Sequence, residues 1–228
     1  MKIYKIPADL RAFIFDIDST LYTNKAYAFE QVDCQVRQFA KERGISADEA
    51  RRMVSDYRKK FAAEHNGSKV SLGNTLLSFG VPIEQSVQWR RELLEPADYL
   101  GRDEKLIETL KILASKYQLI CVTNNPVLPA RKTLDAIGVS EFFPEIVGLD
   151  TCLKSKPAIE PFETAVERLS KASVDVDSSG NREPVTAENC IAVGDRYDMD
   201  IALPLKMGMG GILVSGVEEV YQIIKSVL

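Results

Sequence analysis

The sequence predicts a three-layer α/β fold, in which helices cover both faces of a parallel sheet. Five short apolar runs have the length and composition of strands that are buried on both faces. They lie at residues 12–15, 118–122, 145–148, 190–193 and 211–214. Between these runs apolar residues repeat at helical spacing, as at Leu106, Leu110 and Leu113. Strands that alternate with helices along a chain are typical of a Rossmann-like parallel sheet.

One long segment after the first strand interrupts this alternation, because it reads as successive helices without a convincing strand. Ser46 begins a capping box, and Pro82 suits the first turn of a later helix. We therefore predict an inserted α-helical cap domain in an α/β catalytic core. The cap comprises residues 23–97, and the core comprises residues 1–22 and 98–228.

In the second half of the chain, prolines, glycines and polar turn-forming residues mark the expected ends of helices and one loop. Pro126 opens and Gly138 closes a helix after the second strand. Pro157 suits the first turn of a helix that precedes the fourth strand. Residues 173–186 are polar and rich in turn formers, so they predict an exposed loop. Pro204 lies within an expected helix, where it either occupies the first turn or kinks the helix.

The composition is that of a soluble folded protein. The chain has 228 residues, of which 45% are hydrophobic and 27% are charged. A net charge of -4 and a pI near 5.3 argue against a nucleic acid polymer as partner. The N-terminus resembles no signal peptide, and no apolar run is long enough to cross a bilayer. The four cysteines are widely spaced, as reduced thiols usually are. These features predict a cytoplasmic protein without membrane contact.

Two acids, Asp16 and Asp18, follow the first predicted strand directly. Charges at the end of a buried strand cost free energy unless a cation or hydrogen bonds compensate them. Ligands of an open parallel sheet bind outside the carboxyl ends of its strands, which is where we expect both acids. By itself, the pair is equally well explained by two surface carboxylates.

The segments after the later strands supply complementary groups. They are a hydroxyl, an amide, a lysine and two more acids, at Thr123, Asn124, Lys156, Asp195 and Asp200. Carboxylates, a hydroxyl, an amide and one positive charge can together hold a phosphate beside Mg²⁺. Asp16, Asp195 and a phosphate dianion bring about four negative charges, of which Mg²⁺ and Lys156 neutralise about three. Each residue alone has an ordinary surface explanation, but the ordered set indicates a site.

These residues lie in four motifs, DIDST, VTNN, KP and GDRYDMD, which resemble those of the haloacid dehalogenase-like superfamily. The resemblance spans residues 12 to 200 and includes a helical cap after the first strand, the first cap type of that family. Ser19 occupies a position that often holds Gly or Asn in the family. The stretches LY at Leu21 and VTNNPVLPARKTLDAIGV look most similar to the pyrimidine 5′-nucleotidase-like branch.

The resemblance implies Mg²⁺-dependent phosphoryl chemistry. Asp16 would attack phosphorus and form an aspartyl-phosphate. Asp18 would protonate the leaving alkoxide and then deprotonate the hydrolytic water. Thr123 and Asn124 would bind the substrate, and Lys156 would bind the phosphoryl group and screen Asp16.

The resemblance also implies the metal ligands. Mg²⁺ would be held by Asp16, by the backbone carbonyl of Asp18 and by Asp195, while Asp200 would reach the ion through a water molecule or support one of its ligands. Asp198 is either a further partner or an exposed acid. Lys154 competes with Lys156 for the same role, and the proline that follows favours Lys156.

The predicted function is hydrolysis of a small phosphorylated metabolite, either a nucleoside monophosphate or a sugar phosphate. A phosphomutase and a non-catalytic binding protein of the same fold are the alternatives. Several cationic residues of the predicted cap either bind an anionic group of the substrate or form the solvent-exposed face of a helix. They are Arg52, Arg58, Lys59, Lys60, His65 and Lys69. Trp89 is better explained by core packing than by stacking on a base. The physiological substrate stays open, as does the choice between monomer and homodimer.

Overall fold

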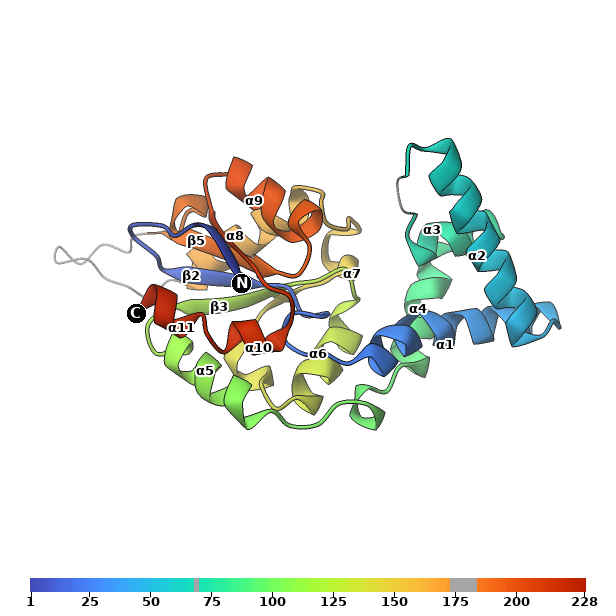
Figure 1. Ribbon diagram of the computed structural model, residues 1–228, viewed down its shortest axis with the longest axis horizontal. Helices are drawn as coiled ribbons and strands as arrows, with labels where there is room; N and C mark the ends of the chain where they lie inside the picture. Colours follow the sequence, from blue (N-terminus) through green and yellow to red (C-terminus); the bar gives the residue numbers. More distant parts are fainter. Residues whose placement is uncertain (68–69, 173–183) are drawn as a thin grey trace. The chain divides into compact units, whose positions relative to one another are not determined.

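The computed structural model describes residues 1–67, 70–172 and 184–228. The chain folds into two compact units (Figure 1), one formed by Met1–Asn24 with Ala97–Leu228 and the other by Lys25–Pro96. The predicted cap, residues 23–97, differs from the second unit by two residues at its start and by one at its end. Most of the loop predicted at residues 173–186 falls outside the described residues.

A six-stranded sheet forms the centre of the first unit, in the order β1-β6-β5-β2-β3-β4. Its strands are β1 Lys2–Lys5, β2 Ala12–Phe15, β3 Gln118–Val122, β4 Ile146–Val147, β5 Cys190–Gly194 and β6 Gly210–Leu213. Strands β2 to β6 are parallel and overlap the five predicted runs, which confirms the fold class. The sequence missed β1, an antiparallel edge strand on β6, because its side chains are mostly exposed and form no apolar run.

Helices cover both faces of this sheet. They are α5 Glu104–Ala114, α6 Val127–Ala136, α7 Leu149–Cys152, α8 Glu160–Ala172, α9 Ala202–Lys206, α10 Val217–Val220 and α11 Ile224–Val227. Figure 1 shows α8 and α9 on one face, and α5 and α11 on the other. Ile14 of β2 packs in one core cluster with Phe162 of α8. Its neighbour Phe15, on the opposite face, contacts the ring of Phe143 edge-on.

The second unit is built from α1 Lys25–Arg43, α2 Ala47–Glu64, α3 Leu72–Ser78 and α4 Ile83–Leu93. Within the described part of this unit there is no strand. Ser46 caps α2 by accepting a hydrogen bond from the Glu49 amide, as the capping box predicts. Trp89 is buried in the core of the unit, so packing explains it. Among the cap cations, Arg58 is half-buried and Lys69 lies outside the described residues, while the other four are exposed.

The structure tests the helix positions predicted for Pro157 and Pro204. Pro157 does not begin a helix, since α8 starts only at Glu160. The prediction for Pro157 is therefore wrong, because the backbone at Lys156 is bonded to another loop, as described below. Pro204 lies in the first turn of α9, where a missing amide donor is tolerated.

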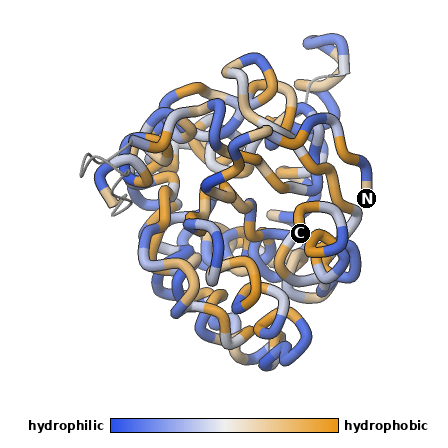
Figure 2. Tube along the Cα trace, turned by 90° about the vertical axis from the view of Figure 1, so that its left-hand side faces the viewer, coloured by the Kyte–Doolittle hydropathy of each residue, from blue (hydrophilic) through white to orange (hydrophobic). Residues whose placement is uncertain are grey.

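Hydrophilic and hydrophobic residues alternate closely along the trace of Figure 2. None of the helices in the described ranges is long and apolar enough to span a membrane. All four cysteines are free thiols, and Cys34, Cys121 and Cys190 are buried.

Candidate active site

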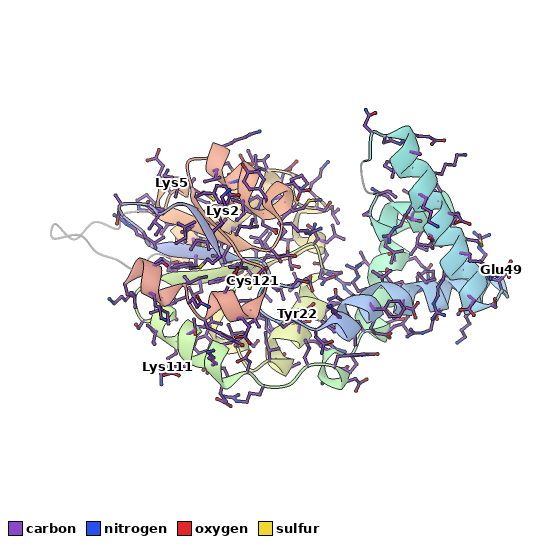
Figure 3. All side chains as sticks on the ribbon, viewed as in Figure 1. Lys2, Lys5, Tyr22, Glu49, Lys111 and Cys121 are labelled. Carbon is purple, nitrogen blue, oxygen red and sulfur yellow. The ribbon has the colours of Figure 1, made fainter. Side chains whose placement is uncertain are left out.

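The predicted site residues meet at the carboxyl edge of the sheet. β2 lies between β3 and β5, and Phe15 pairs with both Cys121 and Val193. The segments after these three strands therefore start side by side. The amide of Asp16 continues the pairing by donating to the Val193 carbonyl over 2.8 Å. Tyr22 and Cys121, labelled in Figure 3, belong to the segments after β2 and within β3 that border this edge.

Lys156 connects two of the acids. Its Nζ donates to Asp16 Oδ1 and to Asp200 Oδ1, both over 2.6 Å. All three side chains are at most 5% exposed. Lys154, in contrast, is exposed to solvent. The structure therefore brings Lys156, and not Lys154, into contact with the acidic cluster.

The backbone of Lys156 is bonded to the loop that follows β3. Its amide donates to Asn124 Oδ1 over 2.7 Å, and its carbonyl accepts from Asn124 Nδ2 over 3.4 Å. This pair of bonds directs Asn124 toward the polypeptide of Lys156, although the sequence analysis assigned this amide to the substrate. We infer that it holds the lysine at the edge of the sheet.

Asp200 reaches the site because Gly194 lacks a side chain. A Cβ at position 194 would lie only 2.3 Å from the Cβ of Asp200. Asp200 belongs to the π-helical turn Tyr197–Ile201, a rare form that often occurs at functional sites. Its second oxygen, Oδ2, accepts from the Arg196 amide over 3.0 Å. Both oxygens of Asp200 are thus bonded to the protein.

Asp16, Asp195 and Asp200 each offer an oxygen within 4.8 Å of the others. Asp195 Oδ1 is buried and has no hydrogen-bond partner among the described residues; its ion pair with Arg196 is long, at 3.9 Å. Three carboxylates against one ammonium leave a charge deficit that a divalent cation would match. Hard cations such as Mg²⁺ prefer carboxylate oxygens, so the residues fit that ion.

Burial is the strongest single influence on the pKa of Asp16, Asp195 and Lys156. Burial raises the pKa of Asp16 to about 7, although the charge of Lys156 acts in the opposite direction. Burial and the neighbouring charge of Asp200 also raise the pKa of Asp195. For Lys156 burial favours the neutral amine, but Asp16 and Asp200 outweigh it and raise the pKa to about 12. A bound cation would favour the ionised form of both acids.

Asp18 lies beside this cluster and is surrounded by donors. Tyr22 donates its hydroxyl to Asp18 Oδ1 over 2.6 Å, and Asn125 donates from Nδ2 to Oδ2 over 2.7 Å. The hydroxyl of Thr123 makes a longer contact with Oδ2, at 3.4 Å. Asp198 is exposed and forms no part of the cluster of Asp16, Asp195 and Asp200.

Sequence reasoning missed Thr20, Tyr22 and Asn125 as site residues. The hydroxyl of Thr20 donates to Asp16 Oδ2 over 3.1 Å, just as the hydroxyl of Tyr22 donates to a carboxylate oxygen of Asp18. Both donors stand four positions after their acceptor. The turn that allows this passes through Ser19 with φ of 62°, a left-handed conformation. The four-residue spacing from acid to donor is visible in the sequence. It predicts these hydrogen bonds only if the left-handed turn at Ser19 is already known.

The protein is thus of the α/β class, with a parallel sheet that carries a buried lysine and three carboxylates at its carboxyl edge. A family model of the haloacid dehalogenase-like hydrolases matches residues 10–208, and the chain belongs to this family. It is therefore a phosphohydrolase, as the motifs implied.

Individual relatives are distant but match almost the whole chain. A phosphoglycolate phosphatase from Shigella sonnei (strain Ss046) is 22% identical, covering 92% of this chain and 91% of its own. The HAD-hydrolase YfnB from Bacillus subtilis, solved bound to magnesium, is 18% identical with a TM-score of 0.60, over 95% and 99% of the two chains. β-Phosphoglucomutase from Clostridium difficile is 16% identical with a TM-score of 0.51, over 95% and 99%. At these identities the two structures share the fold. The likeness to the pyrimidine 5′-nucleotidase-like branch stays a prediction.

Proposed function

We propose that this protein is a Mg²⁺-dependent phosphatase that cleaves a small phosphomonoester through an aspartyl-phosphate on Asp16. The observation that carries the proposal is the Lys156 ammonium, 2.6 Å from both Asp16 and Asp200, in a cluster where Asp195 Oδ1 has no hydrogen-bond partner among the described residues. A structural ion pair would need one acid for one lysine. Three buried or half-buried acids around one lysine are the arrangement that a cation and a phosphate would complete.

In the first half-reaction an oxygen of Asp16 attacks phosphorus. The bond from phosphorus to the ester oxygen breaks, and the leaving oxygen takes its electron pair and a proton from Asp18. Lys156 screens the negative charge of the phosphoryl group, and the hydroxyl of Thr123 binds a phosphoryl oxygen. The products of this step are the alcohol and the aspartyl-phosphate.

In the second half-reaction a water molecule attacks phosphorus while Asp18 accepts one of its protons. The bond between phosphorus and the Asp16 oxygen breaks, and its electron pair restores the carboxylate. Inorganic phosphate leaves, and Asp18 again carries the proton needed for the next turnover.

Asp16 and Asp195 would hold the metal directly, together with the Asp18 backbone carbonyl. Asp200, whose oxygens accept from Lys156 and from the Arg196 amide, would act from further out. When bound, Mg²⁺ supplies positive charge that lowers the repulsion between the phosphate and the acids.

The substrate class is a small phosphorylated metabolite. The sequence motifs favour a nucleoside monophosphate or a sugar phosphate, and the similarity to a phosphoglycolate phosphatase adds phosphoglycolate to the compounds to test. A phosphomutase would use the same acids, but it would pass the phosphoryl group to a second substrate instead of water.

The test is phosphate release from a panel of these three substrate types, with Mg²⁺ and with a chelator, for the wild type and for Asp16→Asn. Metal-dependent release that the variant loses supports the proposal. An isomerised product with little free phosphate would instead identify a mutase. A fully active Asp16→Asn enzyme would exclude the covalent mechanism.

A further inference from the structure

Asp18 is held from both sides by side chains of its own unit. Tyr22 bonds one oxygen over 2.6 Å and Asn125 bonds the other over 2.7 Å. Tyr22 and Asn125 are each only 4% exposed. One donor follows β2 and the other follows β3, so the two reach Asp18 from separate segments. A carboxylate bonded at both oxygens cannot rotate without breaking one of these bonds.

Asn125 is itself anchored. The backbone carbonyl of Asn125 accepts from the Leu149 amide over 2.9 Å, and the backbone amide of Asn125 donates to Thr123 Oγ1 over 3.1 Å. Gly148 packs so closely on this loop that a Cβ there would lie 2.8 Å from the Asn125 carbonyl oxygen. The end of β3 and the loop after β4 therefore fix the position of Asn125, and Asn125 in turn fixes the position of Asp18.

This arrangement matters because Asp18 has two tasks. A carboxylate offers about four acceptor sites, and the bonds from Tyr22 and Asn125 use one on each oxygen. They thereby fix the directions in which the remaining sites point. Proton transfer requires such alignment within hydrogen-bond reach of the reacting oxygen.

We propose that Tyr22 and Asn125 are positioning residues that align Asp18, and that hydrolysis of the aspartyl-phosphate depends on them most. The inference rests on the proposed function. In that step water forms the new bond to phosphorus, its proton goes to Asp18, and the Asp16–phosphorus bond breaks with its electron pair returning to Asp16.

The experiment compares Tyr22→Phe with the wild type on two esters in Mg²⁺. One is the best alkyl monoester of the panel, and the other is 2,4-dinitrophenyl phosphate, whose leaving group needs no proton. We expect the first-turnover release of dinitrophenol to stay within about twofold of the wild type. Steady-state kcat for both esters should fall about 10- to 100-fold, a part of the full effect of general acid–base catalysis. For the dinitrophenyl ester KM should fall together with kcat, because kcat/KM reports the unchanged transfer of the phosphoryl group to Asp16. Acid-quenched enzyme should carry more covalent phosphate than the wild type does.

Two further variants sharpen the test. Asn125→Asp keeps the shape of the side chain but places an acceptor against Asp18, so it should also accumulate phosphoenzyme. Tyr117→Phe is the matched control, because it removes a hydroxyl that donates to the Val227 carbonyl over 3.0 Å. It should leave the fraction of phosphoenzyme and both turnover rates unchanged.

Asp18→Asn separates failure of this inference from failure of the proposed function. If the wild type hydrolyses both esters and Asp18→Asn accumulates phosphoenzyme, but Tyr22→Phe behaves like Tyr117→Phe, only the positioning role is overturned. Equal slowing of the first and later turnovers in Tyr22→Phe, without more phosphoenzyme, overturns it as well. A wild-type enzyme inactive on every ester would remove the proposed function and this inference with it.

Discussion

Gly194 and Asp200 pack against each other so closely that a methyl group on the glycine would lie 2.3 Å from the Asp200 Cβ. Real carbon atoms do not approach so closely without bonding, so either the backbone or Asp200 would have to move. Asp200 holds one side of Lys156, which in turn contacts Asp16. The contact of Lys156 with both Asp16 and Asp200 therefore depends on the absence of a side chain at Gly194, the last residue of β5.

Gly194→Ala should consequently disable the enzyme. We expect phosphate release to fall at least about 100-fold, because a displacement of about 1 Å in a site has that effect. Overpacking should also destabilise the fold by about 1–3 kcal/mol. Gly101→Ala is the control, since its new Cβ would meet no atom within 4 Å. Equal activity of the two variants would show that Asp200 can shift freely.

Lys156→Met should remove the only cation that contacts Asp16 and Asp200 among the described residues. Breaking a buried ion pair at one partner costs about 3–5 kcal/mol, and here two acids lose their partner. We expect a clear fall in urea stability in the absence of Mg²⁺ and no measurable turnover. Lys154→Met, at an exposed position, should stay within about 0.5 kcal/mol of the wild type. Loss of activity in Lys154→Met instead would reverse the assignment of the two lysines.

Asp195→Asn tests the metal site without a measurement of activity. Asp195 Oδ1 is the buried oxygen without a hydrogen-bond partner among the described residues, so it is the one most available to a cation. We expect the Kd for Mg²⁺, measured by calorimetry, to rise by more than about tenfold, because even the outer partners of metal ligands contribute that much. Asp198→Asn removes an exposed acid of the same motif and should leave the Kd unchanged. Similar losses in both variants would point to general electrostatic attraction.

Asp33 makes the stability of the cap unit dependent on pH. Hydrogen bonds from Arg51 and Arg37 lower the pKa of Asp33 below its ordinary value, although burial acts against them. A lowered pKa in the folded state means that the contribution is present above the unfolded value, near pH 4, and is lost as the pH falls through the folded value.

At pH 7 Asp33→Asn should lower the free energy of unfolding of this unit by about 1–2 kcal/mol, since both arginines are partly exposed and solvent screens them. The difference from the wild type should shrink as the pH falls below about 4. Trp89 is the only tryptophan of the chain and is buried in this unit, so its fluorescence reports the transition. Asp48→Asn, which removes another partner of Arg51 at a mostly exposed acid, should have little effect. A pH-independent difference would contradict the proposed role of the Asp33 charge.

The sequence by itself determined the five parallel strands and the edge of the sheet at which the acids meet. Apolar runs such as residues 12–15 carry this information locally, because a strand buried on both faces has no polar residues. Asp16, Thr123 and Asp195 follow such runs within two residues, so their location depends on little besides the strand ends.

Only the tertiary structure decided which neighbouring polar groups point into the site and what they bond. Lys156 and Lys154 share one loop, and Asn124 and Asn125 are adjacent, yet the members of each pair have different surroundings. Their directions depend on turns such as that at Ser19, and on partners that are more than 30 positions away in the chain. The physical reason is that hydrogen bonds at the end of a strand satisfy groups brought together by the sheet, and local sequence does not encode that pairing.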